Sequence, residues 1–259
     1  MEHLMTELMN TFPLLNAYLG AGIFVFARIL GFFRLAPVFN RKEIPGMVKI
    51  SLALLITIIL TCMIKPEVTV VQNSFLLSIL LNFVVGALIG YVAQLILLAI
   101  DAGGDMINMQ MGLSSAMVLD PTTSSQVSIV GKCFQFIGLL IFIQLGGVYW
   151  LLQALMHSIE IFPLDATAIP LSELVNMDYI IKLSSSVLYM GLQIASPILL
   201  ATLGQDIILG VISKTAPQVN VFQLSFLFKP VLGAAIMVWI LPMLVNIISD
   251  YFMSYANII

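Results

Sequence analysis

The chain has 259 residues, of which 61% are hydrophobic and only 9% are charged, and its mean hydropathy is +1.10. Soluble domains carry roughly 25% charged residues, so this composition excludes an ordinary soluble enzyme or binding domain and predicts an integral membrane protein. The formal net charge of −3 is spread along the chain, with no basic stripe, so we expect no nucleic-acid partner.

Six segments are apolar and approach or exceed the ~20 residues that a helix needs to cross a bilayer. We therefore expect an all-α integral membrane protein that forms a single helical membrane domain over residues 1–259. Several of the six segments contain a charge or a proline, which predicts kinked or hairpin-like helices. The segments are residues 14–36, 47–64, 75–100, 130–156, 183–205 and 230–249.

The first segment carries Arg28 near its middle, where an arginine costs about 2.5–3.5 kcal/mol on insertion scales. That cost favours a side chain that faces protein and has a partner, for which Asp101, Asp105 and Asp120 are candidates. The alternative is that Arg28 extends its charged group to the membrane surface.

The third segment contains Gly86 and Gly90, a spacing that lets two helix backbones approach closely. The partner helix could lie in this chain or in another.

A polar stretch rich in glycine and methionine, residues 101–128, follows the third segment. Two runs without Asp, Glu, Lys or Arg lie on either side of it. They are the 33 residues from Val68 to Ile100 and the 27 residues from Cys133 to Ile159. Lipid does not tolerate irregular backbone unless protein or a water-filled cavity satisfies its polar groups. The stretch is therefore predicted to be an aqueous loop or a pore element.

Methionine is flexible and repacks easily, so the methionines of this stretch suit a seal that deforms and re-forms. Ordinary core packing is the alternative. The four methionines within twelve residues are Met106, Met109, Met111 and Met117.

Basic residues are concentrated in every second connection between the predicted spans. By the positive-inside rule, this distribution predicts that both termini lie on the outer, periplasmic side. The segment from Lys214 to Lys229 joins the last two spans and is either a re-entrant hairpin or a plain loop. The inner connections hold Arg34, Arg41, Lys42, Lys49, Lys132, Lys214 and Lys229, and the outer ones hold only Lys65 and Lys182.

Three stretches, in this order, resemble the FliR/SctT family of type III export-gate proteins. They are RILGFFRLAPVF (residues 28–39), QMGLSSAMVLDP (residues 110–121) and APQVNVFQLSF (residues 216–226). The chain departs from the family at Ser225 to Leu227, where members often read Gly-Phe-Pro, so the turn after Phe222 is expected to differ.

The resemblance implies a subunit of the core export gate of the flagellar type III secretion system, in the bacterial inner membrane at the flagellar basal body. It implies a helical hetero-oligomeric pore with about five copies of FliP and about four of FliQ, near FlhB and FlhA and in contact with membrane lipid. Unfolded flagellar proteins would pass through it. No catalytic residue, cofactor or metal is expected.

The resemblance also assigns a plug to the central loop of residues 101–128. The expected plug residues are Met106, Met109, Gln110, Met111, Gly112, Leu113, Ser114, Met117, Asp120 and Pro121. The residues expected to form intramembrane charge or subunit contacts are Arg28, Gly86, Gly90, Asp105 and Lys132.

Three other functions remain open. The gate could belong to a virulence secretion system instead of a flagellum. Arg28, Asp101 and Asp105 could form the charge relay of a secondary transporter or ion channel. The same two aspartates could form an intramembrane protease, although the chain lacks the Tyr-Asp and Gly-x-Gly-Asp motifs of that class.

Overall fold

The computed structural model describes residues 13–41, 43–64, 75–116, 118–120, 125–164 and 177–256. Within these ranges every regular element is helical apart from two strands of three residues, which confirms the predicted all-α membrane fold. Five of these helices are long and apolar enough to cross a membrane, and a bent pair raises the number to six. The predicted placement of both termini on one side requires all six, so it stays a prediction.

The chain forms two compact units. Unit 1 comprises residues 1–94 and 149–180, and unit 2 comprises residues 95–148 and 181–259. Unit 1 is built from α2 (Pro13–Leu35), α3 (Gly46–Met63), the first part of α4 (Phe75–Gln110) and most of α6 (Gly147–Ile161).

Helices α2 and α4 cross in unit 1 with almost no space between their backbones. A Cβ atom on Gly86 would lie 1.8 Å from the carbonyl oxygen of Arg28, and one on Gly31 would lie 2.0 Å from that of Phe83. Gly90 meets the backbone of Ala36 in the same way, at 2.7 Å. The glycine pair of α4 therefore has its partner within this chain, namely α2.

The turn after α2 contains a strained residue. Val38 has φ of 71°, a region that β-branched residues rarely occupy. Aromatic packing accompanies the turn, since the rings of Phe33 and Phe39 stack with centroids 4.4 Å apart and Phe32 lies 6.0 Å from Phe39. This packing offsets the strain and fixes the direction in which the chain leaves α2.

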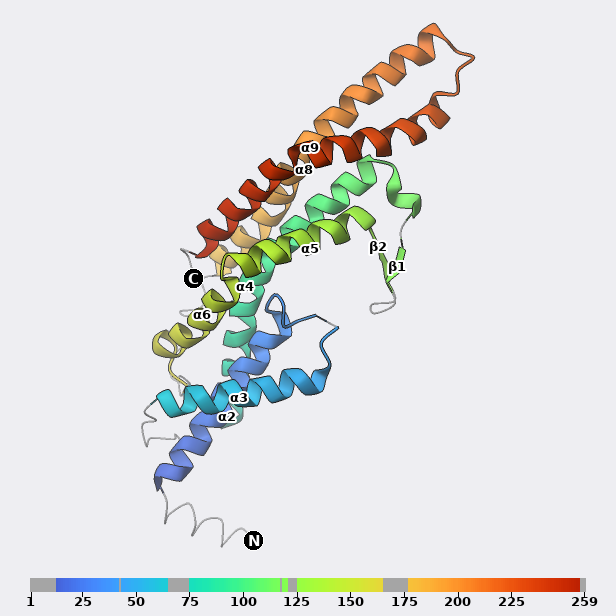
Figure 1. The fold of residues 1–259 in the computed structure, drawn as a ribbon. Coiled ribbons are helices and arrows are strands. Elements are labelled where there is room, and N and C mark those ends of the chain that lie inside the picture. The colour runs from blue at the N-terminus through green and yellow to red at the C-terminus, as the bar shows by residue number, and fades with distance from the viewer. Residues whose placement is uncertain are drawn as a thin grey trace. The chain divides into compact units, whose positions relative to one another are not determined.

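Unit 2 contains the end of α4, the central loop, α5 (Ile129–Gln144), most of α8 (Met177–Thr215) and α9 (Val221–Ala256). Helices α8 and α9 form an antiparallel hairpin (Figure 1). Lys229 of α9 donates to Asp206 of α8 at 2.8 Å, and the hydroxyl of Tyr251 donates to the side chain of Gln193.

Helices α8 and α9 are longer than the spans predicted at 183–205 and 230–249. With 39 and 36 residues they reach about 54–58 Å, almost twice the ~30 Å thickness of a hydrocarbon core. Most of the stretch between Lys214 and Lys229 is helical, and α9 begins where the side chain of Asn220 accepts from the backbone of Gln223 at 3.2 Å. The predicted loop is thus a short connection of residues 216–220 between two long helices, and the re-entrant alternative stays a prediction.

Pro197 lies inside α8 and does not end it. Proline lacks the N–H that would bond to the carbonyl four residues earlier, here that of Gln193. The hydroxyl of Ser196 donates to that carbonyl at 2.9 Å and replaces the missing bond. The helix continues because this freed backbone group is satisfied.

The segment predicted as one span over residues 130–156 is broken into two helices, α5 and α6, and it stays a prediction that the pair crosses the membrane as one span. The chain bends by 67° between α5 and α6. Gly146 has φ of 78°, and Leu145 closes the end of α5 through its N–H. The sequence hides this break because the run from Cys133 to Ile159 contains no proline and no charge, and the residues on both sides of Gly146 and Gly147 are hydrophobic.

Candidate functional site

The central loop begins later than predicted. Residues 101–110 continue α4, and irregular backbone starts at Met111. The two glycines of this region allow close helix packing instead of a turn. A Cβ on Gly103 would lie 2.9 Å from the carbonyl oxygen of Gly191 in α8, and one on Gly104 would lie 2.7 Å from the Cα of Gly131 in α5.

The expected plug residues therefore occupy several kinds of local structure. Three lie on α4, two in the turn that follows, two in the short helix η1 (Leu113–Ala116) and one at the end of strand β1 (Val118–Asp120). Met117 and Pro121 lie outside the described residues. In that order, the described ones are Met106, Met109, Gln110, Met111, Gly112, Leu113, Ser114 and Asp120.

Strand β1 pairs antiparallel with β2 (Ser125–Val127), so the loop returns on itself as a short hairpin. Asp120 is opposite Ser125, and Val118 is opposite Val127. Figure 1 shows this hairpin between the end of α4 and the start of α5. The two strands of the hairpin therefore bring Val118 and Val127, near the two ends of the loop, next to each other.

The base of the loop is closed by side-chain hydrogen bonds. The hydroxyl of Ser128 donates to the carboxylate of Asp105 and accepts from the backbone N–H of Gly131 at 2.8 Å. Ser128 thus caps the start of α5 and links it to α4. Together with the contact of Gly104 and Gly131, this link makes the base of the loop a fixed frame.

The methionines of the segment have different surroundings. Met111 is 3% exposed, and its side chain lies so close to α9 that a Cβ on Gly233 would be 2.6 Å from its Cγ. Met109 is 68% exposed, and Met106 is half-buried. Met111 is therefore part of the core of unit 2, while Met109 is available to a partner.

Gly112 ends the helical part of the segment. Its φ of 73° lies in the left-handed region, its N–H donates to the carbonyl of Met109 at 3.1 Å, and nothing lies within 4 Å of a Cβ built on it. Left-handed glycines commonly terminate helices in this way. The glycine is required here by the backbone and not by packing.

Asn108 is a residue of this site that the sequence analysis missed. It is 1% exposed, and neither its amide oxygen nor its amide nitrogen has a hydrogen-bond partner among the residues that the structure describes. The available signal was its position four residues after Gly104, which places it on the same face of α4.

Arg28 forms a second polar centre, in unit 1, and is fully buried. Its Nε and Nη2 donate to the side-chain oxygen of Asn82 at 3.0 and 2.7 Å. Its Nη1 donates to the carbonyl and hydroxyl oxygens of Ser158 at 2.8 and 3.3 Å, and Nη2 also donates to the carbonyl of Phe162 at 2.9 Å. These partners are neutral oxygens, so the predicted carboxylate partners were wrong.

The position of these oxygens explains how the charge is balanced. Ser158 lies in the last turn of α6 and Phe162 follows its end, where helix carbonyls lack intrahelical partners and carry partial negative charge. Arg28 therefore caps α6. The side-chain nitrogen of Asn82 is held by the carbonyls of Ser78 and Leu164 at 2.8 and 2.9 Å, which turns its oxygen toward Arg28.

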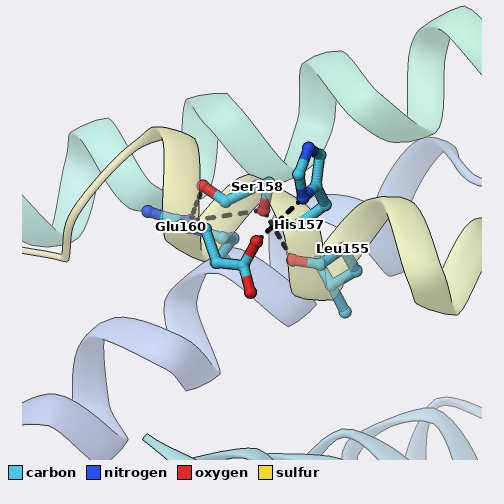
Figure 2. Close-up of polar contacts among 5 residues, drawn as sticks. Leu155, His157, Ser158 and Glu160 are labelled. Carbon is cyan, nitrogen blue, oxygen red and sulfur yellow. Dashed lines mark hydrogen bonds and ion pairs between the residues drawn. The ribbon is translucent and has the colours of Figure 1, made fainter. Parts of the chain in front are cut away.

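Figure 2 shows the end of α6, where Ser158 also donates to the carbonyl of Leu155 at 2.6 Å. His157 and Glu160 pair at 2.9 Å on the exposed side of this helix. The arginine centre and the surface pair thus occupy different sides of α6.

These contacts argue against a charge relay. The guanidinium group has five N–H donors, and each of the five hydrogen bonds of Arg28 uses one. The carboxylate of Asp105 accepts from Ser128, and the amine of Lys132 lies 5.7 Å from the ring centre of Phe136. Two of the three residues of the predicted relay, Arg28 and Asp105, are thus engaged in structural contacts.

The fold and these sites define a helical membrane protein with an irregular central segment held on a closed base. Comparison with known proteins makes the class specific. Residues 19–255 match the family described as Bacterial export proteins, family 1, and the chain belongs to that family. It is therefore a membrane component of a bacterial export apparatus.

Curated relatives match along most of their length. The chain is 29% identical over 220 residues to the flagellar biosynthetic protein FliR of Buchnera aphidicola from Acyrthosiphon pisum, covering 84% of this chain and 83% of the relative. It is 24% identical to FliR of Escherichia coli, covering 90% and 88%. It is also 27% identical to the Yop proteins translocation protein T of Yersinia pestis, covering 82% of each.

Proposed function

We propose that the chain is a subunit of the core export gate of a flagellar type III secretion system, located in the inner membrane at the flagellar basal body. It assembles with FliP and FliQ, about five and about four copies, and lies near FlhB and FlhA. It has no catalytic activity and binds no cofactor. Its cargo is unfolded flagellar protein.

The observation that carries this proposal is the full-length match to the export family and to flagellar relatives. The exposed apolar surface supports assembly with lipid and partner helices. Three large apolar side chains are each more than 80% exposed, namely Met47 of α3, Leu76 of α4 and Trp239 of α9. Soluble monomers rarely expose large apolar patches, so we expect these side chains to contact lipid or partner helices.

Within the complex, residues 106–121 act as the plug. In the closed gate, Met and Leu side chains of the plug pack across the lumen and exclude water and ions. Opening exchanges these contacts for an unfolded chain, around which methionine repacks readily. The fixed base at Asp105 and Ser128 supports this role, because it lets the part of the plug beyond Gln110 move while α4 and α5 stay in place.

A virulence secretion gate is the second candidate, favoured by the relative from Yersinia pestis. Both candidates predict the same kind of complex. They differ in cargo, so the chain should restore swimming to a flagellated strain that lacks its own FliR, and should not restore secretion to a virulence system.

Native mass spectrometry tests the assembly. The tagged chain is expressed with and without FliP and FliQ, and the purified species are weighed. We expect one copy of the chain with several copies of each partner. A stable species of this chain alone, unchanged when the partners are present, would contradict the proposal and favour a transporter.

A further inference from the structure

Asn108 occupies an unusual place in the central segment. Three described side chains carry buried polar atoms without a hydrogen-bond partner, namely Thr61 in unit 1 and Asn108 and Gln205 in unit 2. Of the two in unit 2, Asn108 is the more deeply buried, at 1% exposed against 8% for Gln205. It is also the one within the proposed plug.

An amide that is buried without a partner loses its bonds to water and gains none in return. Such a group destabilises the conformation that buries it. Asn108 therefore disfavours the closed arrangement of the segment, and any conformation that gives its amide a partner is favoured by comparison. A leucine at this position would avoid the penalty, so the asparagine requires another explanation.

The location of Asn108 indicates when a partner could reach it. It lies one helical turn beyond Gly104, on the face that meets Gly131 at the start of α5. Ile107 and Met111 on either side are buried as well. Beyond this level, α5 gives way to the loop that the link between Asp105 and Ser128 closes. Asn108 is thus the last buried polar residue of α4 before the loop, at the level where the proposed opening of the gate would begin.

We propose that Asn108 is a hydrogen-bonding site for the main chain of the polypeptide in transit. A primary amide offers one donor group and one acceptor, which match the C=O and N–H of a peptide unit. An unfolded chain inside a narrow apolar gate loses water from its main-chain groups and needs such partners. Because every sequence has these groups, the site serves any cargo. This inference rests on the proposed export function.

The test compares two leucine variants in the complete complex. Asn108→Leu and Gln205→Leu each replace a buried unpaired amide of unit 2 by an apolar side chain, and only the first lies in the plug. We expect both variants to assemble, and the thermal midpoint of each complex to equal or exceed that of the wild type. Asn108→Leu should slow secretion about tenfold, the factor expected for one hydrogen bond, whereas Gln205→Leu should stay within about twofold.

A cross-linking experiment tests contact directly. Asn108→Cys is introduced into a Cys62→Ala, Cys133→Ala background, because both native cysteines are exposed thiols. The cargo is an export substrate fused to a domain that resists unfolding, so that its chain stalls in the gate, with a single cysteine at successive positions. We expect disulfide cross-links at neighbouring cargo positions, and the same result with a second cargo of unrelated sequence.

The outcomes separate the two proposals. Secretion by Asn108→Leu at the wild-type rate, equal slowing by both leucine variants, or no cross-link to stalled cargo would overturn the role of Asn108 alone. A wild-type chain that neither joins FliP and FliQ nor supports secretion would overturn the export function and this inference with it.

Discussion

Arg28 is the residue on which unit 1 depends most directly, since its guanidinium group joins α2, α4 and the end of α6. We predict that Arg28→Lys destabilises the protein although the charge is kept. Lysine has three donors on a single nitrogen and cannot reach acceptors that lie on different sides of a planar group. Each buried acceptor left without a donor costs about 1–3 kcal/mol. Thermal unfolding of the purified complex in detergent measures the loss.

The matched control for this variant lies on α6, the helix whose end Arg28 caps. His157→Ala removes a side chain that is 58% exposed and pairs with Glu160 at the surface. Exposed pairs contribute at most about 1 kcal/mol, so the unfolding midpoint should barely change. An Arg28→Lys protein as stable as the His157→Ala protein would show that the five hydrogen bonds contribute little.

Gly112 supports a second prediction at this scale. Its left-handed φ suits glycine, and the left-handed conformation costs other residues about 1–2 kcal/mol. Gly112→Val should therefore destabilise the end of α4 and reduce secretion, whereas Gly112→Asn should be close to the wild type, because asparagine tolerates this region. Since no atom lies within 4 Å of the position that a Cβ would take, equal effects of the two variants would contradict a backbone cause.

Sequence reasoning at the level of residues reached part of this picture. The insertion cost of a mid-span arginine correctly indicates that Arg28 faces protein. Its partners could not be predicted, because carbonyl oxygens at a helix end have no signature in the sequence. Asn82 and Ser158 look like ordinary polar residues until α4 and α6 are placed against α2.

At the level of elements, the crossing of α2 and α4 is set by glycine. We predict that Gly86→Ala disrupts it, because the added Cβ would lie 1.8 Å from the backbone oxygen of Arg28 and backbone cannot give way as a side chain can. Overpacking costs about 1–3 kcal/mol or more. Gly210→Ala is the control, since that glycine lies inside α8 with open space around it. The unfolding midpoint of the purified complex in detergent should fall for Gly86→Ala only, and a fall in both would point to a general intolerance of substitution.

Hydropathy located the helices well and their ends poorly. The runs at residues 14–36 and 47–64 match α2 and α3 within a residue or two. The polar stretch from Asp101 was predicted to leave the helix, yet α4 continues to Gln110, because Gly103 and Gly104 are packed against α8 and α5. Apolar periodicity reports burial in general and cannot distinguish lipid, a partner subunit or a neighbouring helix. The bend at Gly146 was hidden for the same reason.

For the molecule as a whole, composition alone excluded a soluble protein, and three short stretches indicated the family that the full-length comparison then established. The division into two units was not predicted. The chain passes from one unit to the other inside helices α4, α6 and α8, and not in a linker that composition would mark. Contacts between distant segments decide that division, and those depend on the fold.

The plug supplies the last prediction, at the scale of the assembled complex. Replacing residues 112–127 by a short Gly-Ser linker removes η1 and the hairpin but retains Asp105 and Ser128 at the base. If the segment closes the lumen, cells that produce this variant with FliP and FliQ should lose membrane potential, measured with a potential-sensitive dye. The same variant without its partners should leave the potential unchanged, because no lumen exists. A linker of the same length in place of residues 216–220, between α8 and α9, is the control for altered loops. An unchanged potential in a complex that still assembles would show that the barrier lies elsewhere.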